Sequence, residues 1–288
     1  MLPQILNYNS SLTAHHPVDR EAIQQGKIYV APPDHHLLVN RGYVQLTRGP
    51  KENRSRPAID PLFRTAARYY GPRVVGVILS GSLDDGTAGL AAIKQRGGLA
   101  VVQDPREALF SGMPQSALDN VEVDHCLPIA EIAPLLARLV LEPAEAEDAY
   151  PVTERMDFES YVPQMKEISM EDIERIGEPS VFTCPECHGT LWEVHDGDLL
   201  RFRCHVGHAF SADSLMAEQS EALEGALWAA LRALEENAAF SRRMAERARK
   251  HHQTLLAGRY EGNASELEQH ALAIRQVLQT NEKVGSGD

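Results

Sequence analysis

The chain has 288 residues and a formal net charge of −13, and 43% of its residues are hydrophobic. This length allows one to three domains, and the hydrophobic fraction is enough for a packed core. The acidic balance argues against nucleic acid as a partner, because phosphate binding needs clustered Lys and Arg. No signal peptide and no apolar run long enough to cross a membrane is seen, so a cytoplasmic protein without membrane insertion is expected.

The first 47 residues predict few regular elements. His15 and His16 lie in a polar stretch and are interpreted as ordinary surface histidines. A short strand at Lys27–Ala31 ends at two prolines, and a β-hairpin is predicted after it. His35 and His36 either contact a substrate or are ordinary hairpin residues whose rings are hydrogen-bonded, and the sequence leaves both interpretations open. The two strands of the hairpin are His36–Asn40 and Tyr43–Thr47.

A basic loop and a helix come next. Residues 48–56 carry Lys51, Arg54 and Arg56 with little acid to offset them. The loop is therefore either simply solvated or a surface on which an acidic partner could dock. Asp60-Pro61 predicts the start of a helix, because Asp accepts free N–H groups and Pro suits the first turn. Gly71-Pro72 predicts its end.

The most informative stretch runs from Val74 to Leu90. Residues 74–79 are apolar or Gly, which is typical of a strand buried on both faces of a parallel sheet. The loop after this strand carries Asp84 and Asp85, and a helix is predicted from Thr87 to Arg96. Carboxylates just past the carboxyl end of a parallel strand either cap the next helix or take part in chemistry. The local pattern leaves both interpretations open.

The remaining elements up to residue 141 continue to alternate between strand and helix. Strands are predicted at Leu99–Val102 and Val121–Val123, and an amphipathic helix at Ile129–Leu141. This alternation predicts an α/β fold with a doubly wound parallel sheet. Cys126 is interpreted as a packing residue and not as a nucleophile.

Several motifs follow one another in a fixed order along this half of the chain. From about Leu2 to Leu141, the chain resembles the catalytic domain of the chemotaxis protein-glutamate methylesterases of the CheB type. The motifs that carry the resemblance are Asn53-Arg54-Ser55-Arg56-Pro57-Ala58-Ile59-Asp60-Pro61-Leu62-Phe63, Leu79-Ser80-Gly81-Ser82-Leu83-Asp84-Asp85-Gly86-Thr87-Ala88-Gly89, Gln103-Asp104-Pro105 and Gly112-Met113-Pro114.

The resemblance implies a hydrolase of chemotaxis signal transduction, which removes methyl esters from glutamates on receptors. Such enzymes use a Ser nucleophile, a His base and an Asp that orients the His and stabilises its charged form. The family's Asp precedes the Gly of the strand–loop motif, which assigns that role to Asp85. The family's oxyanion hole takes a backbone N–H from the same loop, at a position that matches Ser82.

Two members of that triad have no matching positions in this sequence. The family's Ser and His lie upstream of a helix that Met1–Leu6 resembles. A sheet without the family's first strands would also expose apolar strand edges, which proteins avoid. We therefore expect either a chain that is incomplete at its N-terminus, or a catalytically inactive homologue that serves as a binding or assembly module.

An acidic linker is predicted at residues 142–178. It holds 12 acidic and 3 basic residues, which gives it −9 of the total charge of −13. Its periodicity is weak and three prolines interrupt it, so most of it is expected to lack regular structure. Apolar residues such as Tyr150, Phe158 and Tyr161 either dock on a domain surface or belong to a plain linker.

A zinc ribbon is predicted at residues 179–210. The pattern Cys-x2-Cys, sixteen residues, then Cys-x3-His is zinc-ligand spacing, with strands at 191–194 and 200–203 on either side of a turn at 196–198. Three cysteines this close together indicate structural metal in a reducing compartment and not disulfides. His205 is an alternative fourth ligand and His188 a weaker candidate. The predicted ligands are Cys184, Cys187, Cys204 and His208.

A helical tail is predicted at residues 211–288. Ser211 can cap a long helix that reaches about Leu256, and a turn at 258–263 leads to a second helix at 264–279. Apolar residues at 223, 227, 231, 234 and 238 form one stripe, which must be covered. The stripe packs either against the second helix, as a helical hairpin, or against another chain in a coiled coil. Self-association through the tail is therefore a further possibility.

The resemblance, the composition and the cysteine spacing together divide the chain into four parts. These are a methylesterase-like domain at 1–141, an acidic linker at 142–178, a zinc ribbon at 179–210 and a helical tail at 211–288.

Overall fold

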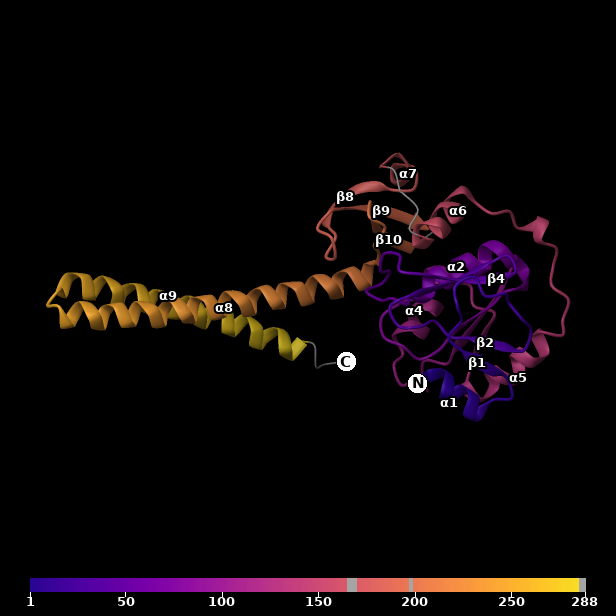
Figure 1. Cartoon of the computed structure of the whole chain (residues 1–288), viewed down its shortest axis with the longest axis horizontal. Helices are drawn as coiled ribbons and strands as arrows, with labels where there is room; N and C mark the ends of the chain where they lie inside the picture. The colour runs from indigo at the N-terminus through magenta and orange to yellow at the C-terminus, as the bar shows by residue number, and fades with distance from the viewer. Residues whose placement is uncertain (165–169, 197–198, 285–288) are drawn as a thin grey trace. The chain divides into compact units, whose positions relative to one another are not determined.

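The computed structural model describes residues 1–164, 170–196 and 199–284 of the chain. It divides into two compact units, Met1–Met216 and Ala217–Asp288. The first unit holds an α/β domain and a small antiparallel sheet, and the second holds a pair of long helices (Figure 1). No helix within the described ranges combines the length and the apolar character needed to cross a membrane.

The first unit begins with short elements, of which the hairpin is as predicted. Helix α1 (Leu2–Asn9) is followed by strands β1 (Thr13–His15) and β2 (Lys27–Tyr29), which pair in parallel. Strands β3 (His36–Asn40) and β4 (Tyr43–Thr47) then form the antiparallel hairpin. Strand β1 was not predicted. It has three residues without apolar alternation, and the Asn7 amide holds it by two hydrogen bonds to the Ala14 backbone, of 2.6 and 2.7 Å.

The main sheet is parallel, as expected. Its strands are β5 (Val75–Ile78), β6 (Leu99–Gln103) and β7 (His125–Leu127), in that order. The prediction of a strand at Val121–Val123 was wrong, because both valines pack against the core from a loop. The strand forms four residues later, directly after Asp124, whose carboxylate accepts the Ala100 N–H at 2.7 Å.

Helices cover both faces of this sheet. Helices α2 (Ile59–Tyr70), α3 (Thr87–Gln95) and α4 (Gly112–Asn120) pack on one face, around a core of Ile78, Leu90, Ile93, Ala100, Val102 and Ala117. Helix α5 (Ile129–Leu139) packs on the other face through Ile132 and Leu135, against Val101. This places the carboxyl end of β5 and the loop after it at one edge of the sheet, with the helices on either side.

The expectation that residues 142–178 mostly lack regular structure was wrong. They include η2 (Glu147–Ala149), α6 (Glu154–Tyr161), η3 (Val162–Gln164) and α7 (Met170–Glu174), and α6 packs beside α2 (Figure 1). Met156 is buried in the core of the α/β domain, and Asp157 forms an ion pair with Arg68. The buried residues of α6 are Met156, Glu159 and Ser160, and two polar residues among three form no apolar stripe from which a docked helix could be predicted.

The predicted ribbon region forms a four-stranded antiparallel sheet. The expected hairpin is present as β9 (Thr190–Asp196) and β10 (Leu199–Cys204), although Gly197 and Asp198 of its expected turn lie outside the described residues. Two strands that were not predicted extend it, β8 (Glu178–Thr183) beside β9 and β11 (Ala209–Ser211) beside β10.

The second unit is a helical hairpin, but its turn lies elsewhere than predicted. Helix α8 (Ala212–Lys250) and helix α9 (Thr254–Val284) run antiparallel about a short turn, and α9 passes straight through the predicted turn at 258–263 (Figure 1). The two glycines there suggested a break, yet a seven-residue repeat overrides them. Buried residues recur at this spacing on α9, at Ala257, Ala264, Ala271 and Leu278.

Matching repeats on α8 face these residues. Leu231, Ala238 and Ala245 are buried at the same spacing of seven. Ion pairs between the helices repeat with them, namely Arg249–Glu261, Arg242–Glu268 and Arg275–Glu235. Small residues at the seam let the two backbones approach closely, and the ion pairs fix which residues face each other.

Candidate functional site

The Asp85 carboxylate lies at the end of the loop after β5 and reaches the first turn of α2. Its Oδ2 accepts the Ile59 N–H at 2.7 Å, and its Oδ1 accepts the Asp60 N–H at 3.4 Å. Asp85 therefore occupies free N–H groups of a helix that starts 26 residues earlier in the chain. The interpretation of the loop aspartates as caps of the following helix was wrong, since α3 has no side-chain cap.

The expectation that Asp60 caps its own helix was also wrong. Helix α2 begins at Ile59, and Asp60 points away to accept the Gly89 N–H of α3 at 2.6 Å. The Asn53 amide joins the two carboxylates, because its Nδ2 donates to Asp60 Oδ2 at 2.8 Å and to Asp85 Oδ1 at 3.1 Å. The site is thus a pair of carboxyl groups that share one amide donor.

Burial makes both of these carboxyl groups weaker acids than an exposed Asp. It raises the pKa of Asp85 to about 7, and the charge of Asp60 adds to the effect. Burial also raises the pKa of Asp60. Two carboxyl groups in such a place cannot both ionise easily near neutral pH, so a proton is readily held between them.

Asp84 has a different partner from its neighbour. Its Oδ1 accepts the Ser211 hydroxyl of β11 at 2.7 Å, and burial raises the pKa of Asp84 to about 6. The carboxylate therefore joins the α/β domain to the four-stranded sheet and has no contact with Asp85's partners in α2. The assignment of the triad position to Asp85 and not to Asp84 stays a prediction.

Ser82, the predicted oxyanion-hole position, lies exposed in the same loop. The loop is fixed around it, because the Gly81 N–H donates to Phe110 O at 3.0 Å and the Met113 N–H donates to Gly81 O at 2.8 Å. In the described part of the chain, the Ser82 N–H donates to no acceptor. An open backbone N–H on a rigid loop has the chemistry of an oxyanion-hole donor.

The histidines near this edge have structural partners. His36 is fully buried, and its Nδ1 accepts the Ala58 N–H at 3.2 Å while Nε2 lies 2.9 Å from Pro50 O. Burial lowers the pKa of His36, so the ring is neutral with its proton on Nε2. His15 pairs with Glu21 at 2.8 Å. The interpretation of His36 as a hairpin residue with a hydrogen-bonded ring is confirmed.

The basic loop at 48–56 is engaged within the unit. Lys51 Nζ lies 2.7 Å from Glu186 Oε1, and Arg56 donates to Asp34 at 2.6 and 2.8 Å. The one acidic residue of the loop, Glu52, is buried and pairs with Arg64 at 2.6 Å. The charges of this loop therefore hold the fold together more than they face a partner.

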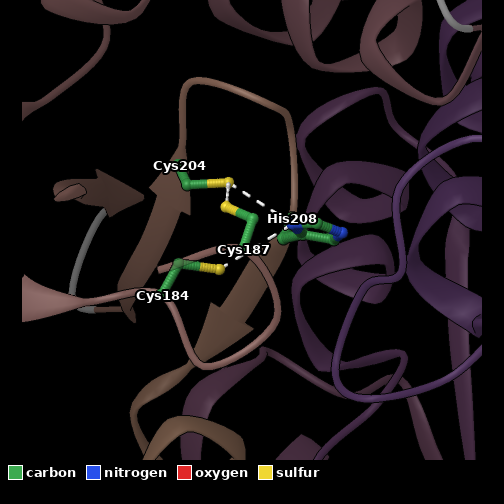
Figure 2. A group of neighbouring side chains, drawn as sticks. All are labelled: Cys184, Cys187, Cys204 and His208. Carbon is green, nitrogen blue, oxygen red and sulfur yellow. Dashed lines mark hydrogen bonds between the residues drawn. The ribbon is translucent and has the colours of Figure 1, made fainter. Parts of the chain in front are cut away.

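The four predicted metal ligands come together in the structure. Their donor atoms all lie within 4.8 Å of one another, and no other such group of three or more is found in the described ranges (Figure 2). His208 Nδ1 lies 3.5 Å from Cys204 Sγ and 3.8 Å from Cys184 Sγ, and Cys187 Sγ lies 3.6 Å from Cys204 Sγ. Tetrahedral zinc with bonds of about 2.3 Å to sulfur and 2.0 Å to nitrogen gives edges of roughly 3.5–3.8 Å.

The donor set thus fits a tetrahedral thiophilic metal. Cys184 and Cys204 are fully buried, whereas the two alternative ligands, His188 and His205, are exposed. The hydrogen bond with Cys184 lowers the pKa of Cys204 to about 3, so a thiolate is present for a metal to bind. Of the open choices, the geometry favours His208 as the fourth ligand.

A chain of buried charges joins the two sheets, and sequence reasoning missed it. Glu52 lies 2.6 Å from Arg64 and 3.4 Å from Arg203, measured between the closest N and O atoms. Glu159 of α6 lies 2.9 Å from Arg201 and 3.5 Å from Arg203. All five side chains are at most 6% exposed. The one signal of it in the sequence is that Arg201 and Arg203 alternate with Leu200 and Phe202 on a strand.

Fold and site together define a class of protein. A parallel α/β sheet carries, after one strand, a half-buried carboxylate and an open backbone N–H, which are two of the groups that a hydrolytic site of the triad type contains. Residues 1–136 match a sequence model of the CheB methylesterase family. This segment is similar to the catalytic domains of CheB-type methylesterases.

Individual proteins are similar to the same half of the chain. A Leptospira interrogans protein is 46% identical over 122 residues, which are 42% of this chain and 63% of that protein. The protein-glutamate methylesterase/protein-glutamine glutaminase of Pyrococcus abyssi is 39% identical over 124 residues, which are 42% of this chain and 34% of that protein. The crystal structure of the Thermotoga maritima CheB methylesterase catalytic domain has 34% identity and a TM-score of 0.46, over 48% of this chain and 76% of that one.

The chain therefore spans less than two thirds of the length of these curated relatives.

Proposed function

We propose that this protein acts in the hydrolysis of glutamate methyl esters on receptors of a chemotaxis-type signalling system. The observation that carries the proposal is the position of Asp85, a half-buried carboxylate after a parallel strand, inside a segment that matches the CheB methylesterase family model. In this reaction water replaces the methoxy group, which leaves a glutamate carboxylate and methanol. The relatives' names add the hydrolysis of glutamine amides, for which the same groups would serve.

Asp85 would orient a catalytic histidine. Its two oxygens accept three hydrogen bonds, from Ile59, Asp60 and Asn53, and Oδ2 accepts only one of them. A carboxylate has about four acceptor positions, so one remains for a histidine N–H. A protonated histidine there would also draw the Asp85 pKa down from about 7 and keep the carboxylate ionised.

The Ser82 N–H would stabilise the negative charge that develops on the ester oxygen. The Ser and the His that complete the family's triad have no matching positions among the 288 residues.

Methanol release tests the proposal. The native protein from its source is assayed with methylated receptor, and Asp85→Asn is expected to lower the rate by about 10³–10⁴-fold, because the histidine loses its orienting acceptor. Asp84→Asn is the matched control and should retain most of the rate. Steady release that Asp85→Asn leaves unchanged would overturn the catalytic assignment.

A second candidate function is a binding or assembly module without catalysis. It is favoured by the observation that Asp85 already has a structural role at the first turn of α2. This function predicts no methanol release from any form of the protein, together with retention of methylated receptor on the immobilised chain. Release that depends on Asp85 would exclude it.

The ribbon is proposed to bind one structural zinc ion. Cys184, Cys187, Cys204 and His208 would hold it, and four protein ligands leave no open position for chemistry. Metal analysis of the purified protein is expected to give about one zinc per chain. The exchange Cys187→Ser should abolish it, whereas Cys126→Ser, at the exposed cysteine of the α/β domain, should not.

Self-association through the helical hairpin is retained as a proposal about partners. Leu223, Trp228, Phe240, Leu272 and Val277 are 49–63% exposed on the two helices. Sedimentation at rising concentration tests it, and a molecular mass that stays at that of one chain would exclude it.

A further inference from the structure

The strand that follows the proposed metal ligands binds directly to the loop that holds the carboxyl pair. The Asn53 N–H donates to Ala209 O at 2.9 Å, and the Ala209 N–H donates to Lys51 O at 3.3 Å. Ala209 is the residue next to His208 in the chain. The first residue after a proposed metal ligand thus forms the backbone contact with Asn53.

The Asn53 side chain lies between the two parts. On one side, its Nδ2 donates to the carboxylates of Asp60 and Asp85. On the other side, its Oδ1 accepts the Ser211 N–H at 3.1 Å and the Ser214 hydroxyl at 3.4 Å. All the hydrogen-bonding capacity of this amide therefore serves to connect the carboxyl pair with β11 and the start of α8.

Asn53 is also held in an unusual backbone conformation. Its φ is +47°, in the left-handed region that Asn enters more easily than most residues. Arg54 follows with a φ of +67°. Two successive residues in this region persist only where surrounding contacts hold them, and β11 provides such contacts.

Two further contacts to this loop lie beside metal ligands. Arg203, which pairs with Glu52, directly precedes Cys204. Glu186, which pairs with Lys51, lies between Cys184 and Cys187. Residues adjacent to three of the four proposed ligands, Cys187, Cys204 and His208, thus contact residues 51–53.

We propose that the metal-binding ribbon is part of the candidate active site, and that it holds Asp85 in place through Asn53 as a positioning residue. The inference rests on the proposed metal site and on the proposed role of Asp85. When a bound metal holds the ribbon's ligands together, the position of β11 is fixed. β11 then holds the Asn53 amide in place, and the amide holds the carboxyl pair in place. By linkage, the same contacts strengthen metal binding.

Hydrogen exchange of the full chain, with zinc bound and after chelation, tests the coupling without any measurement of activity. The amides of residues 51–60 should exchange at least tenfold faster after chelation, because the Asn53, Ile59 and Asp60 N–H groups lose fixed acceptors. The amides of α5, which packs on the other face of the sheet, should not change. If zinc binds but chelation leaves the exchange of residues 51–60 unchanged, this inference alone is overturned. If no zinc binds, the proposed metal site is overturned together with it.

The variant Asn53→Ala separates positioning from simple support of the fold. Zinc affinity, measured by competition with a chelator, should fall by about 5–100-fold, the usual range of coupling between two sites. The Asp85 pKa, followed through its carboxyl carbon by NMR, should rise further, because the Asn53 hydrogen bond lowers it. A pKa that falls toward that of an exposed Asp would mean that the site has opened, and would overturn the positioning role.

Asn40→Ala is the matched control. Asn40 is a second buried asparagine, whose amide bonds to Gln45 within the β3–β4 hairpin. It should leave zinc affinity, the exchange of residues 51–60 and the Asp85 pKa unchanged. An equal loss of zinc affinity in both variants would assign the effect to general stability and overturn the inference.

Discussion

At the scale of single residues, burial decides the charge of the groups around Asn53. Burial raises the pKa of Asp60, Asp84 and Asp85. Glu52 is equally buried but lies between two arginines, whose charges outweigh the effect of burial and hold its pKa at about 2. Within one small region, carboxyl groups of the same chemistry thus ionise several pH units apart.

This difference predicts how stability depends on pH. A carboxyl whose pKa is raised on folding stabilises the fold while protonated, so this contribution is complete below about pH 4 and is lost as the pH rises. For Asp84 and Asp85 the loss occurs as the pH passes through about 6 and about 7. The urea concentration at the midpoint of unfolding of the first unit should therefore decrease as the pH is raised from 5 to 8. The double variant Asp84→Asn/Asp85→Asn should flatten this slope, and a midpoint that rises over the range would contradict the assignment.

Glu52, unlike these aspartates, stabilises the fold in its charged form, and its replacement gives a second prediction at the scale of residues. Replacement of Glu52 by Gln leaves Arg64 and Arg203 buried without their shared anion, which should cost about 3–5 kcal/mol of unfolding free energy. Denaturant titration measures the loss. Glu131→Gln, at an exposed position in the first turn of α5, should change stability by less than about 0.5 kcal/mol. Equal effects of the two exchanges would argue against the buried ion pairs.

At the scale of elements, local pattern predicted those parts whose stabilising contacts are local. Strands β5 and β6, the β3–β4 hairpin and the β9–β10 pair have clear alternation or apolar runs, and all of them form. Strand β1 is held by Asn7, which lies seven residues from Ala14, but its three residues show no apolar alternation. Strand β11 and helix α6 depend on distant partners, namely residues 51–53 and the core around Met156. No short window of sequence contains those partners, so these elements could not be predicted.

The candidate site divides in the same way. The metal ligands follow from spacing alone, because each pair lies within one turn and the pairs flank one hairpin. The position of Asp85 followed from the resemblance to a family. Its contact with Asn53 did not, because Asn53 is 32 residues away from Asp85 in the chain, and Ser211, which donates to Asn53, is 158 residues away from Asn53.

The glycines of α9 give a prediction at this scale. A Cβ at Gly262 would meet open space, so Gly262→Ala should stabilise the hairpin by about 0.5–1 kcal/mol through reduced backbone entropy. The same exchange in α3, Gly89→Ala, should destabilise, since its Cβ would lie 2.5 Å from the Phe63 Cβ. Thermal and urea denaturation measure both. A loss of stability in Gly262→Ala would mean that the predicted turn at 258–263 forms in solution.

At the scale of the whole molecule, boundaries drawn from composition do not coincide with the folded units. The composition separates residues 1–141 from an acidic linker and a ribbon, yet contacts unite them as far as Met216. Met156 of α6 completes the core of the α/β domain, and Arg203 of β10 completes the pairing of Glu52. The segment that matches the methylesterase family is thus stabilised by residues outside the match.

Truncation tests this view. A chain that ends after Met216 should keep the urea midpoint of the first unit within error of the full chain, because the second unit is compact by itself. A chain that ends after Leu141 should be less stable by several kcal/mol, since it loses Met156 from the core and leaves Glu52 and Arg64 exposed. Equal midpoints for the two truncated chains would show that the composition marks the true boundary.

The repeat in the hairpin bears on how the length of the second unit can change. Ion pairs and seam residues recur every seven residues on both α8 and α9. Removal or addition of one heptad in each helix at once restores every facing pair, whereas a change in one helix alone puts all of them out of register. Related chains can therefore differ in the length of this arm by steps of roughly 10 Å while they keep one packing pattern.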